Sequence, residues 1–133
     1  MMKKLLLILL CLPMIGFGQQ TYVPDDNFEA FLEAHGMGDG IMLNDSVLTG
    51  NIDTVTTLNV EWSYIADLTG IEDFDSLQAL SCSGNPLTIL DVSTNLALTY
   101  LACNFNQLDS LDVSQNTALK ETHFSFTSMM MER

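Results

Sequence analysis

Basic residues are scarce in this chain: four Lys and Arg stand against seventeen Asp and Glu in 133 residues. Nucleic acids and anionic membrane surfaces are bound through clusters of Lys and Arg, so neither is expected as a partner. The chain also has only two histidines and three cysteines, with no CxxC pair and no Cys/His cluster, which argues against a zinc centre. There is no glycine-rich phosphate loop, and no motif sets a nucleophile beside a histidine. We therefore expect a non-catalytic protein without a cofactor.

The chain has a single long apolar run, at residues 5–15, and its eleven residues are too few to span a bilayer as a helix. Lys3 and Lys4 precede this run and Gly16-Phe17-Gly18 follows it, the pattern of a signal peptide cleaved after Gly18. A lipoprotein signal that uses Cys11 is the disfavoured alternative, because Leu10 before it is not small. We expect a secreted or cell-surface protein with no membrane insertion. Cleavage would leave two basic residues against seventeen acidic ones, a net charge of about −15.

A repeat with a period of twenty-one residues occupies the second half of the chain. Residues 77–99 match residues 98–120 at twelve of twenty-three positions, where chance would give about one or two. A less regular copy begins at Leu58. Such a period predicts stacked coils rather than one globular core. We expect coils at 58–79, 80–100 and 101–121, followed by a coil that decays from Thr122.

The second and third coils contain the pattern LxCxxNxL, and in the first coil Val60 stands at the cysteine position and Ser63 at the asparagine position. The apolar and polar residues of the pattern alternate through residues 80–82 and 101–103, which predicts a short strand with one buried face. Strands of successive coils should pair in parallel, about 4.8 Å apart. Asn85 and Asn106 are predicted to be structural, because a buried amide can satisfy the backbone groups of the turn after the strand. Two cysteines share one strand position and are predicted to be buried, reduced thiols rather than a disulfide: Cys82 and Cys103.

A helix is predicted over residues 25–35, before the repeats. Asp25 or Asp26 can serve as the N-cap, and Phe28, Phe31 and Leu32 form one apolar face. An amphipathic helix that does not repeat is what the end of a stacked array needs, because the first coil otherwise exposes apolar side chains. The predicted organisation is a signal peptide at 1–18, an N-terminal cap at 19–57, repeats at 58–121, and a degenerate last coil or tail at 122–133.

These residues resemble the leucine-rich repeat superfamily. The segment LALTYLACNFNQLDSLDVSQNTAL at 96–119 looks like repeats of secreted and surface bacterial proteins of this kind. LTGIEDFDSL at 68–77 and PDDNFEAFLEAHG at 24–36 are similar to the first coil and the cap of internalins, so the resemblance covers about residues 22–121. It implies an α/β solenoid, with parallel strands on a concave face and a helical N-terminal cap. It also implies binding of a protein or glycan on that face, without catalysis.

The side chains that point outward from the strands are the candidate binding residues. They form three columns across the coils, and the face they build is polar and mildly acidic. The alternative is a solvated face without a partner of its own, because a protein-binding hot spot would normally contain more Trp, Tyr or Arg. The candidate ligand-binding residues are Asn59, Glu61, Ser81, Ser83, Tyr100, Asn104, Glu121 and His123.

Two other groups of residues leave alternatives open. Trp62, Tyr64 and Phe105 lie in turns after the strands, where packing beneath the turn is the favoured interpretation and flanking a ligand the alternative. Asp91 and Asp112 should stack in register, where calcium could relieve the repulsion of like charges. The favoured interpretation is that both aspartates are simply solvated.

The sequence leaves two hypotheses for function. The first is a secreted, non-catalytic binding module, expected to be a monomer, whose partner is an unknown protein or glycan. The alternative is a truncated remnant or an appendage of a longer secreted or surface protein, such as an enzyme, with no function of its own. The type of repeat does not identify the ligand.

Overall fold

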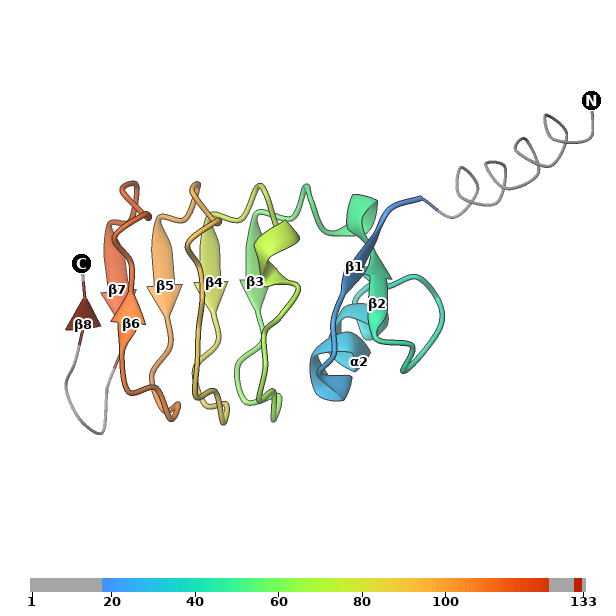
Figure 1. The fold of residues 1–133 in the computed structure, drawn as a ribbon, viewed down its shortest axis with the longest axis horizontal. Coiled ribbons are helices and arrows are strands. Elements are labelled where there is room, and N and C mark those ends of the chain that lie inside the picture. Colours follow the sequence, from blue (N-terminus) through green and yellow to red (C-terminus); the bar gives the residue numbers. More distant parts are fainter. Residues whose placement is uncertain (1–17, 125–130, 133) are drawn as a thin grey trace, which may run out of the picture.

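The computed structural model describes residues 18–124, together with the backbone of residues 131 and 132. The predicted signal peptide, apart from Gly18, and most of the predicted C-terminal tail lie outside the described residues. The described chain forms a row of coils that stack side by side, with a helix and two strands at the N-terminal end of the row (Figure 1).

Four short strands, one from each coil, form a parallel sheet along one side of this row (Figure 1). They are β3 (Thr57–Asn59), β4 (Ala79–Ser81), β5 (Tyr100–Ala102) and β7 (Glu121–His123). The register aligns Thr57 with Ala79, Tyr100 and Glu121. The sheet therefore advances by one sequence repeat per strand, and the predicted α/β solenoid is confirmed.

The core is a stack of identical apolar positions. The central residue of each of the first three strands points inward, and Leu58, Leu80 and Leu101 are at most 2% exposed. Burying a leucine side chain contributes roughly 1.5–3 kcal/mol, so each coil adds a similar increment of stability. Cys82 and Cys103 come directly after β4 and β5 and are fully buried as free thiols. They occupy a core position that Val60 fills in the first coil.

Helix α2 (Asp26–Ala34) forms where the sequence predicts it. Asp25 is the N-cap, and its Oδ1 accepts hydrogen bonds of 3.0 and 2.9 Å from the N–H groups of the second and third helical residues. Phe28 and Leu32 form the apolar face and are fully buried. The helix ends at Ala34 with His35 as the C-cap, and Gly36 follows with a φ of +75°, the left-handed conformation that glycine adopts without steric cost.

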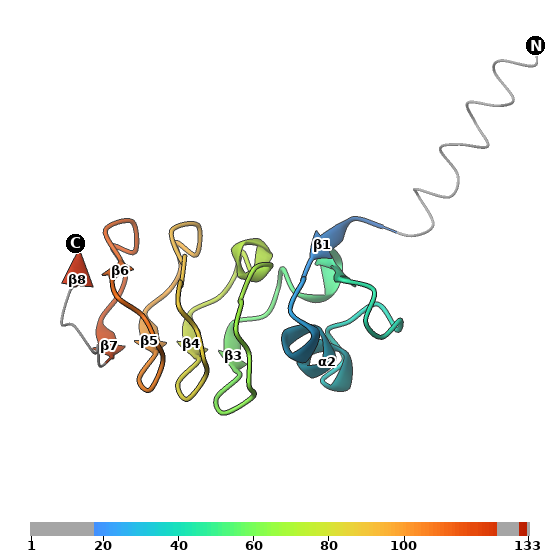
Figure 2. The same cartoon turned by 60° about the horizontal axis from the view of Figure 1, so that its bottom comes forward.

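The N-terminal unit also contains an antiparallel pair of strands that the sequence analysis did not predict. These strands are β1 (Gln20–Tyr22) and β2 (Ser46–Leu48), and Thr21 is aligned with Val47. The two strands flank α2 in the sequence, and Val47 is fully buried. Helix and strand pair together cover the apolar end of the first coil (Figure 2).

Asp25 also joins the helix to the first coil. Its second oxygen, Oδ2, accepts hydrogen bonds from the backbone N–H groups of Ala66 (2.9 Å) and Asp67 (3.1 Å). Beneath this contact the rings of Phe28 and Phe74 stack with their centroids 6.4 Å apart. One carboxylate therefore caps the helix and holds it on the repeats.

The back of the row, opposite the sheet, differs between coils. The first coil carries a 3-10 turn, η2 (Ile71–Asp73), and another short turn, η1 (Thr49–Asn51), precedes the repeats. Farther along, β6 (Leu111–Asp112) pairs in parallel with β8 (Met131–Glu132). Gly70, before η2, has a φ of +108°, and a Cβ there would lie 2.8 Å from Val23. The close approach of the N-terminal unit to this turn thus requires glycine.

Candidate binding surface

The outward side chains of the strands form a continuous polar surface on the sheet. The pairing places Asn59, Ser81 and His123 in one column, and Tyr100 and Glu121 in the column beside it. Tyr100 is half-buried, and its ring packs against His123 with the centroids 5.6 Å apart. The structure therefore brings these five candidate residues together on one face. Glu61 and Asn104 lie just beyond the strand ends.

Ser83 is the one buried residue among the predicted ligand-binding residues. Its side chain is only 7% exposed. Its hydroxyl accepts a 3.0 Å hydrogen bond from the N–H group of Asn104 in the next coil. This hydrogen bond joins the second and third coils, so Ser83 contributes to coil stacking.

Asn85 and Asn106 hold the turns after the strands. The Oδ1 of Asn85 accepts hydrogen bonds from the N–H groups of Ser63 (3.1 Å) and Ile65 (3.0 Å) in the preceding coil. Its Nδ2 donates to the carbonyl oxygens of Val60 and Cys82, both at 2.9 Å. Asn106 joins the second and third coils in the same way: its Oδ1 accepts from the N–H group of Leu87, and its Nδ2 donates to the carbonyl oxygen of Cys82. The amide suits this position because it both donates and accepts.

A second column of buried asparagines lies at the back of the coils. Asn95 and Asn116 are 0% and 4% exposed. Each Nδ2 donates to carbonyl oxygens of the preceding coil, Asn95 to Ile71 at 2.9 Å and Asn116 to Val92 at 2.8 Å. The signal was present in the repeated phrase NxAL, where asparagine recurs among buried apolar positions.

The two cysteine thiols have no access to solvent. Burial raises the pKa of the Cys103 thiol to about 12, and raises that of Cys82 still further. The thiolate is the reactive form of cysteine, so neither group is a nucleophile at neutral pH.

The three aromatic residues of the strand turns are exposed, so the favoured prediction that they pack beneath the turns is wrong. Trp62 is 65% exposed, Tyr64 81% and Phe105 68%. The space beneath the turns is occupied by the asparagine side chains, notably Asn85 and Asn106. The residue just before each asparagine position therefore points outward. The rings of Trp62 and Phe105 lie together, with their centroids 5.8 Å apart.

The two stacked aspartates take part in their own turns. The carboxylates of Asp91 and Asp112 each accept a 2.9 Å hydrogen bond from the N–H group of the serine two residues later. Hydrogen bonds from the side chain and backbone of Ser93 lower the pKa of Asp91, and Ser114 does the same for Asp112. Both side chains are exposed. These local bonds favour the solvated interpretation over a shared calcium ion.

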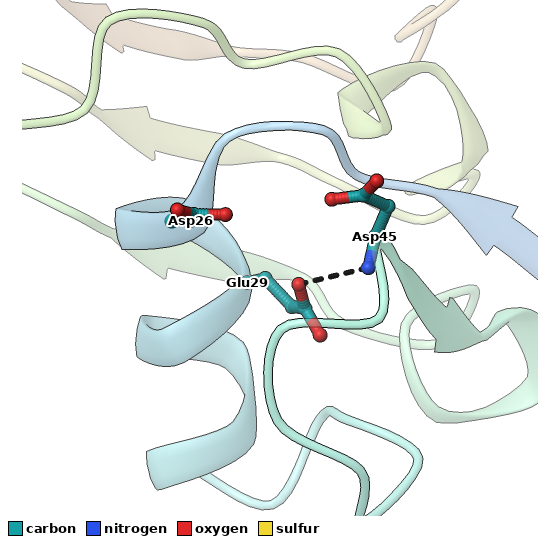
Figure 3. Close-up of side chains that lie close together, drawn as sticks. All are labelled: Asp26, Glu29 and Asp45. Atoms are coloured by element: carbon teal, nitrogen blue, oxygen red, sulfur yellow. Dashed lines mark hydrogen bonds between the residues drawn. The ribbon is translucent and has the colours of Figure 1, made fainter.

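A different acidic group is the one set of three possible metal ligands found among residues 18–124. Oxygen atoms of Asp26, Glu29 and Asp45 lie within 4.8 Å of one another (Figure 3). Glu29 is fully buried, and its carboxylate accepts hydrogen bonds from the N–H groups of Asn44 (2.9 Å) and Asp45 (3.0 Å). The buried carboxylate is thus satisfied by the loop that it holds, without a cation.

A groove of about 580 Å³ lies on the back of the row, between the first and second coils. Asp67, Glu72 and Asp91 line it together with Ile89, which is 77% exposed. It faces away from the sheet and contains none of the candidate ligand-binding residues. Within the described part of the chain, α2 is the one α-helix, and no helix is long and apolar enough to cross a membrane.

Comparison with known proteins identifies the kind of repeat. No family model matches the chain. Internalin J of Listeria monocytogenes is 41% identical over 74 residues, which are 56% of this chain and 8% of that protein. A structure described as the functional domain of internalin J, including a cysteine ladder, covers 81% of this chain at 35% identity with a TM-score of 0.67. That match spans 25% of the internalin J chain.

A second solved structure agrees in fold. The internalin InlF of Listeria monocytogenes covers 81% of this chain with a TM-score of 0.69, at 22% identity and over 33% of its own length. The present chain therefore spans a third or less of each of these relatives. The matching coils, the parallel sheet and the helix before it make this chain an internalin-like leucine-rich repeat protein.

Proposed function

We propose that this chain is a non-catalytic binding module that recognises a protein or glycan with its strand face, and that it is exported by its N-terminal signal. The observation that carries the proposal is the alignment of polar side chains on a rigid parallel sheet. Asn59, Ser81 and His123 stand at equivalent positions of three strands. Hydrogen-bonding groups held at a fixed spacing favour recognition, because little side-chain freedom is lost on binding.

The strand face contains one aromatic pair, Tyr100 and His123. Tyr100 lies on the third strand with the ring of His123 against it. Tyrosine is enriched at hot spots because it combines a large apolar ring with a hydroxyl group. We place the centre of the recognition surface at these two residues, with Asn59, Glu61, Ser81, Asn104 and Glu121 around them.

The chemistry of the described residues supports binding rather than catalysis. The two thiols are buried, and their raised pKa values keep them protonated. The ring of His35 stacks on Phe31, and its Nδ1 lies 2.7 Å from the Phe31 carbonyl oxygen. This histidine therefore packs on the N-terminal helix and is not one of the strand-face residues. Likeness to internalin J also supports a packing role for Cys82 and Cys103, which we propose form a short cysteine ladder.

The test is a binding assay with a variant in the middle of the face. The protein without residues 1–18 is screened against surface-protein fractions and an oligosaccharide array. Ser81→Arg places a large side chain on the strand face, in the same column as Asn59 and His123, and should abolish any interaction made there. Ile89→Ser, on the opposite side, is the control and should leave binding unchanged. Binding that survives Ser81→Arg but is lost in Ile89→Ser would place the site on the back of the coils.

A further inference from the structure

The turns after three successive strands share a backbone conformation that favours glycine. Trp62, Gly84 and Phe105 occupy equivalent positions after β3, β4 and β5, with φ values of +55°, +74° and +56°. The N–H group of Trp62 donates to the carbonyl oxygen of Ser83 at 3.0 Å, and that of Gly84 to Asn104 at 2.9 Å. Bulky residues rarely adopt this conformation, because the Cβ then crowds the backbone. The chain nevertheless places two aromatic residues there.

These residues form an aromatic strip, defined here as the rings of Trp62 and Phe105 with Gly84 between them. The turns after β3, β4 and β5, to which these residues belong, line up along one edge of the molecule (Figure 2). Gly84 allows the two rings to meet across the intervening coil, because a Cβ at this position would overlap the Trp62 ring. The result is a joined apolar surface in which both rings remain about two-thirds exposed.

Folding alone does not account for this strip. The rings lie outside the core, which is filled by the leucines and asparagines of the coils. Glycine would relieve the backbone strain at both aromatic positions, as it does at Gly84. Strained backbone and joined apolar surface are both features that mark binding sites.

The charge of the molecule indicates which ligands the strip can accept. Residues 18–124 contain sixteen acidic residues and a single basic one, Lys120. Glu61, which is exposed, immediately precedes Trp62. An anionic ligand would be repelled by this field, whereas a cation would be attracted to it and to the electron-rich faces of the rings. Tryptophan is the best aromatic partner for an arginine or lysine side chain.

We propose that the aromatic strip binds an arginine- or lysine-bearing extended segment of a partner protein, with the cationic side chain stacked on Trp62. This inference rests on the proposed function of the strand face and adds the chemistry of the partner. Asn104 precedes Phe105, so the strip is continuous with the strand face through this residue. Neutral sugars also stack on aromatic rings, but the acidic residues around the strip would not contribute to binding them.

Trp62 is the sole tryptophan of the chain, so its fluorescence reports directly on the strip. The probe is a synthetic ten-residue peptide of alternating arginine and serine, and the comparison is the same peptide with neutral citrulline in place of arginine. The arginine peptide should change the Trp62 emission saturably. Its Kd should be about tenfold lower than that of the citrulline peptide, the factor expected from a desolvated cation–π contact. Added salt should weaken the binding, because it screens the acidic surface.

Glycine variants test the strip without threatening the fold. Trp62→Gly and Phe105→Gly place at these positions the residue that the second coil already has, so both variants should fold. Calorimetric titration with the arginine peptide should show about a tenfold loss of affinity in each variant. Trp62→Phe should retain part of the affinity, and Ile89→Ser, an exposed residue on the back of the coils, should retain all of it.

Three results would overturn the proposal. Equal affinity for the arginine and citrulline peptides would show that the strip does not recognise a positive charge. A response of Trp62 to oligosaccharides but not to the arginine peptide would show that the strip binds a glycan and not a peptide. Unchanged calorimetric binding in both glycine variants would show that the strip is not a binding site. The strand face is tested separately by Ser81→Arg, so failure of the strip and failure of the proposed function are distinguishable.

Discussion

The N-terminal unit and the repeats solve the same problem with different side chains. Both must satisfy backbone groups at the boundary between neighbouring layers. In the N-terminal unit this is done by carboxylates, Asp25 and Glu29, which accept hydrogen bonds from N–H groups. Between coils it is done by amides, Asn85 and Asn106, which accept from one coil and donate to carbonyl oxygens.

The difference follows from what each boundary presents. An interior coil offers both N–H and C=O groups, so its partner must donate and accept, which an amide does and a carboxylate does not. At the contacts described for Asp25 and Glu29, the backbone offers N–H groups alone, and an acceptor is sufficient. A charged acceptor also makes a stronger hydrogen bond than a neutral one. Side-chain chemistry thus distinguishes the end of the array from its interior.

Removal of the N-terminal helix should have the largest effect on stability. Deletion of residues 19–40 removes α2 and β1 and exposes Phe74, Ile71 and the rest of the first coil's apolar end. We expect aggregation or unfolding, measured by size-exclusion chromatography and thermal melting. If the shortened protein stays monomeric with an unchanged melting curve, the helix is not a cap.

Removal of a leucine from the stack should have the next largest effect. Leu101 is fully buried between two neighbouring coils, and Leu101→Ala should destabilise the protein by about 2–5 kcal/mol through the cavity that it leaves. Urea denaturation measures the change. A loss below about 1 kcal/mol would mean that the strand register is wrong.

Exchange of the two boundary chemistries sharpens the comparison directly. Asn85→Asp keeps the acceptor but places a carboxylate against the carbonyl oxygens of Val60 and Cys82, and should destabilise by about 3 kcal/mol. Asp25→Asn should cost about 1 kcal/mol, because asparagine is a good N-cap and only the bonds to the first coil are lost. The same denaturation assay compares them. Equal losses in the two variants would contradict the distinction between interior and terminal contacts.

The smallest expected effect is that of a thiol reagent on the folded protein. Because both thiols are buried and their pKa values are raised, we expect no reaction with a thiol reagent until the protein is denatured. Intact mass spectrometry should give the mass of the reduced chain. A deficit of about two daltons that disappears on reduction would show a disulfide between them.

The coils were predictable residue by residue because the same environment recurs in each of them. A twenty-one-residue period fixes which positions share a column, so the register from Thr57 to Glu121 follows from the sequence. The helix was predictable because capping and apolar spacing are local signals.

The features that the sequence did not predict depend on contacts that occur once or on what lies beneath a turn. The strands β1 and β2 have three residues each, and the helix lies between them in the sequence, so no local pattern predicts their pairing. Ser83 looked equivalent to its neighbours, but the adjacent turn covers it. Exposure of Trp62 and Phe105 follows from the asparagines that fill the space below, and this becomes visible only in three dimensions.

The double role of Asp25 has a kinetic consequence. One oxygen holds the N–H groups at the start of α2, and the other holds those of Ala66 and Asp67. Fraying of the helix and separation of the helix from the first coil therefore both require the hydrogen bonds of this carboxylate to break. Amide hydrogen exchange at Phe28 and at Ala66 should then report a single opening event, although the two residues lie far apart in the sequence.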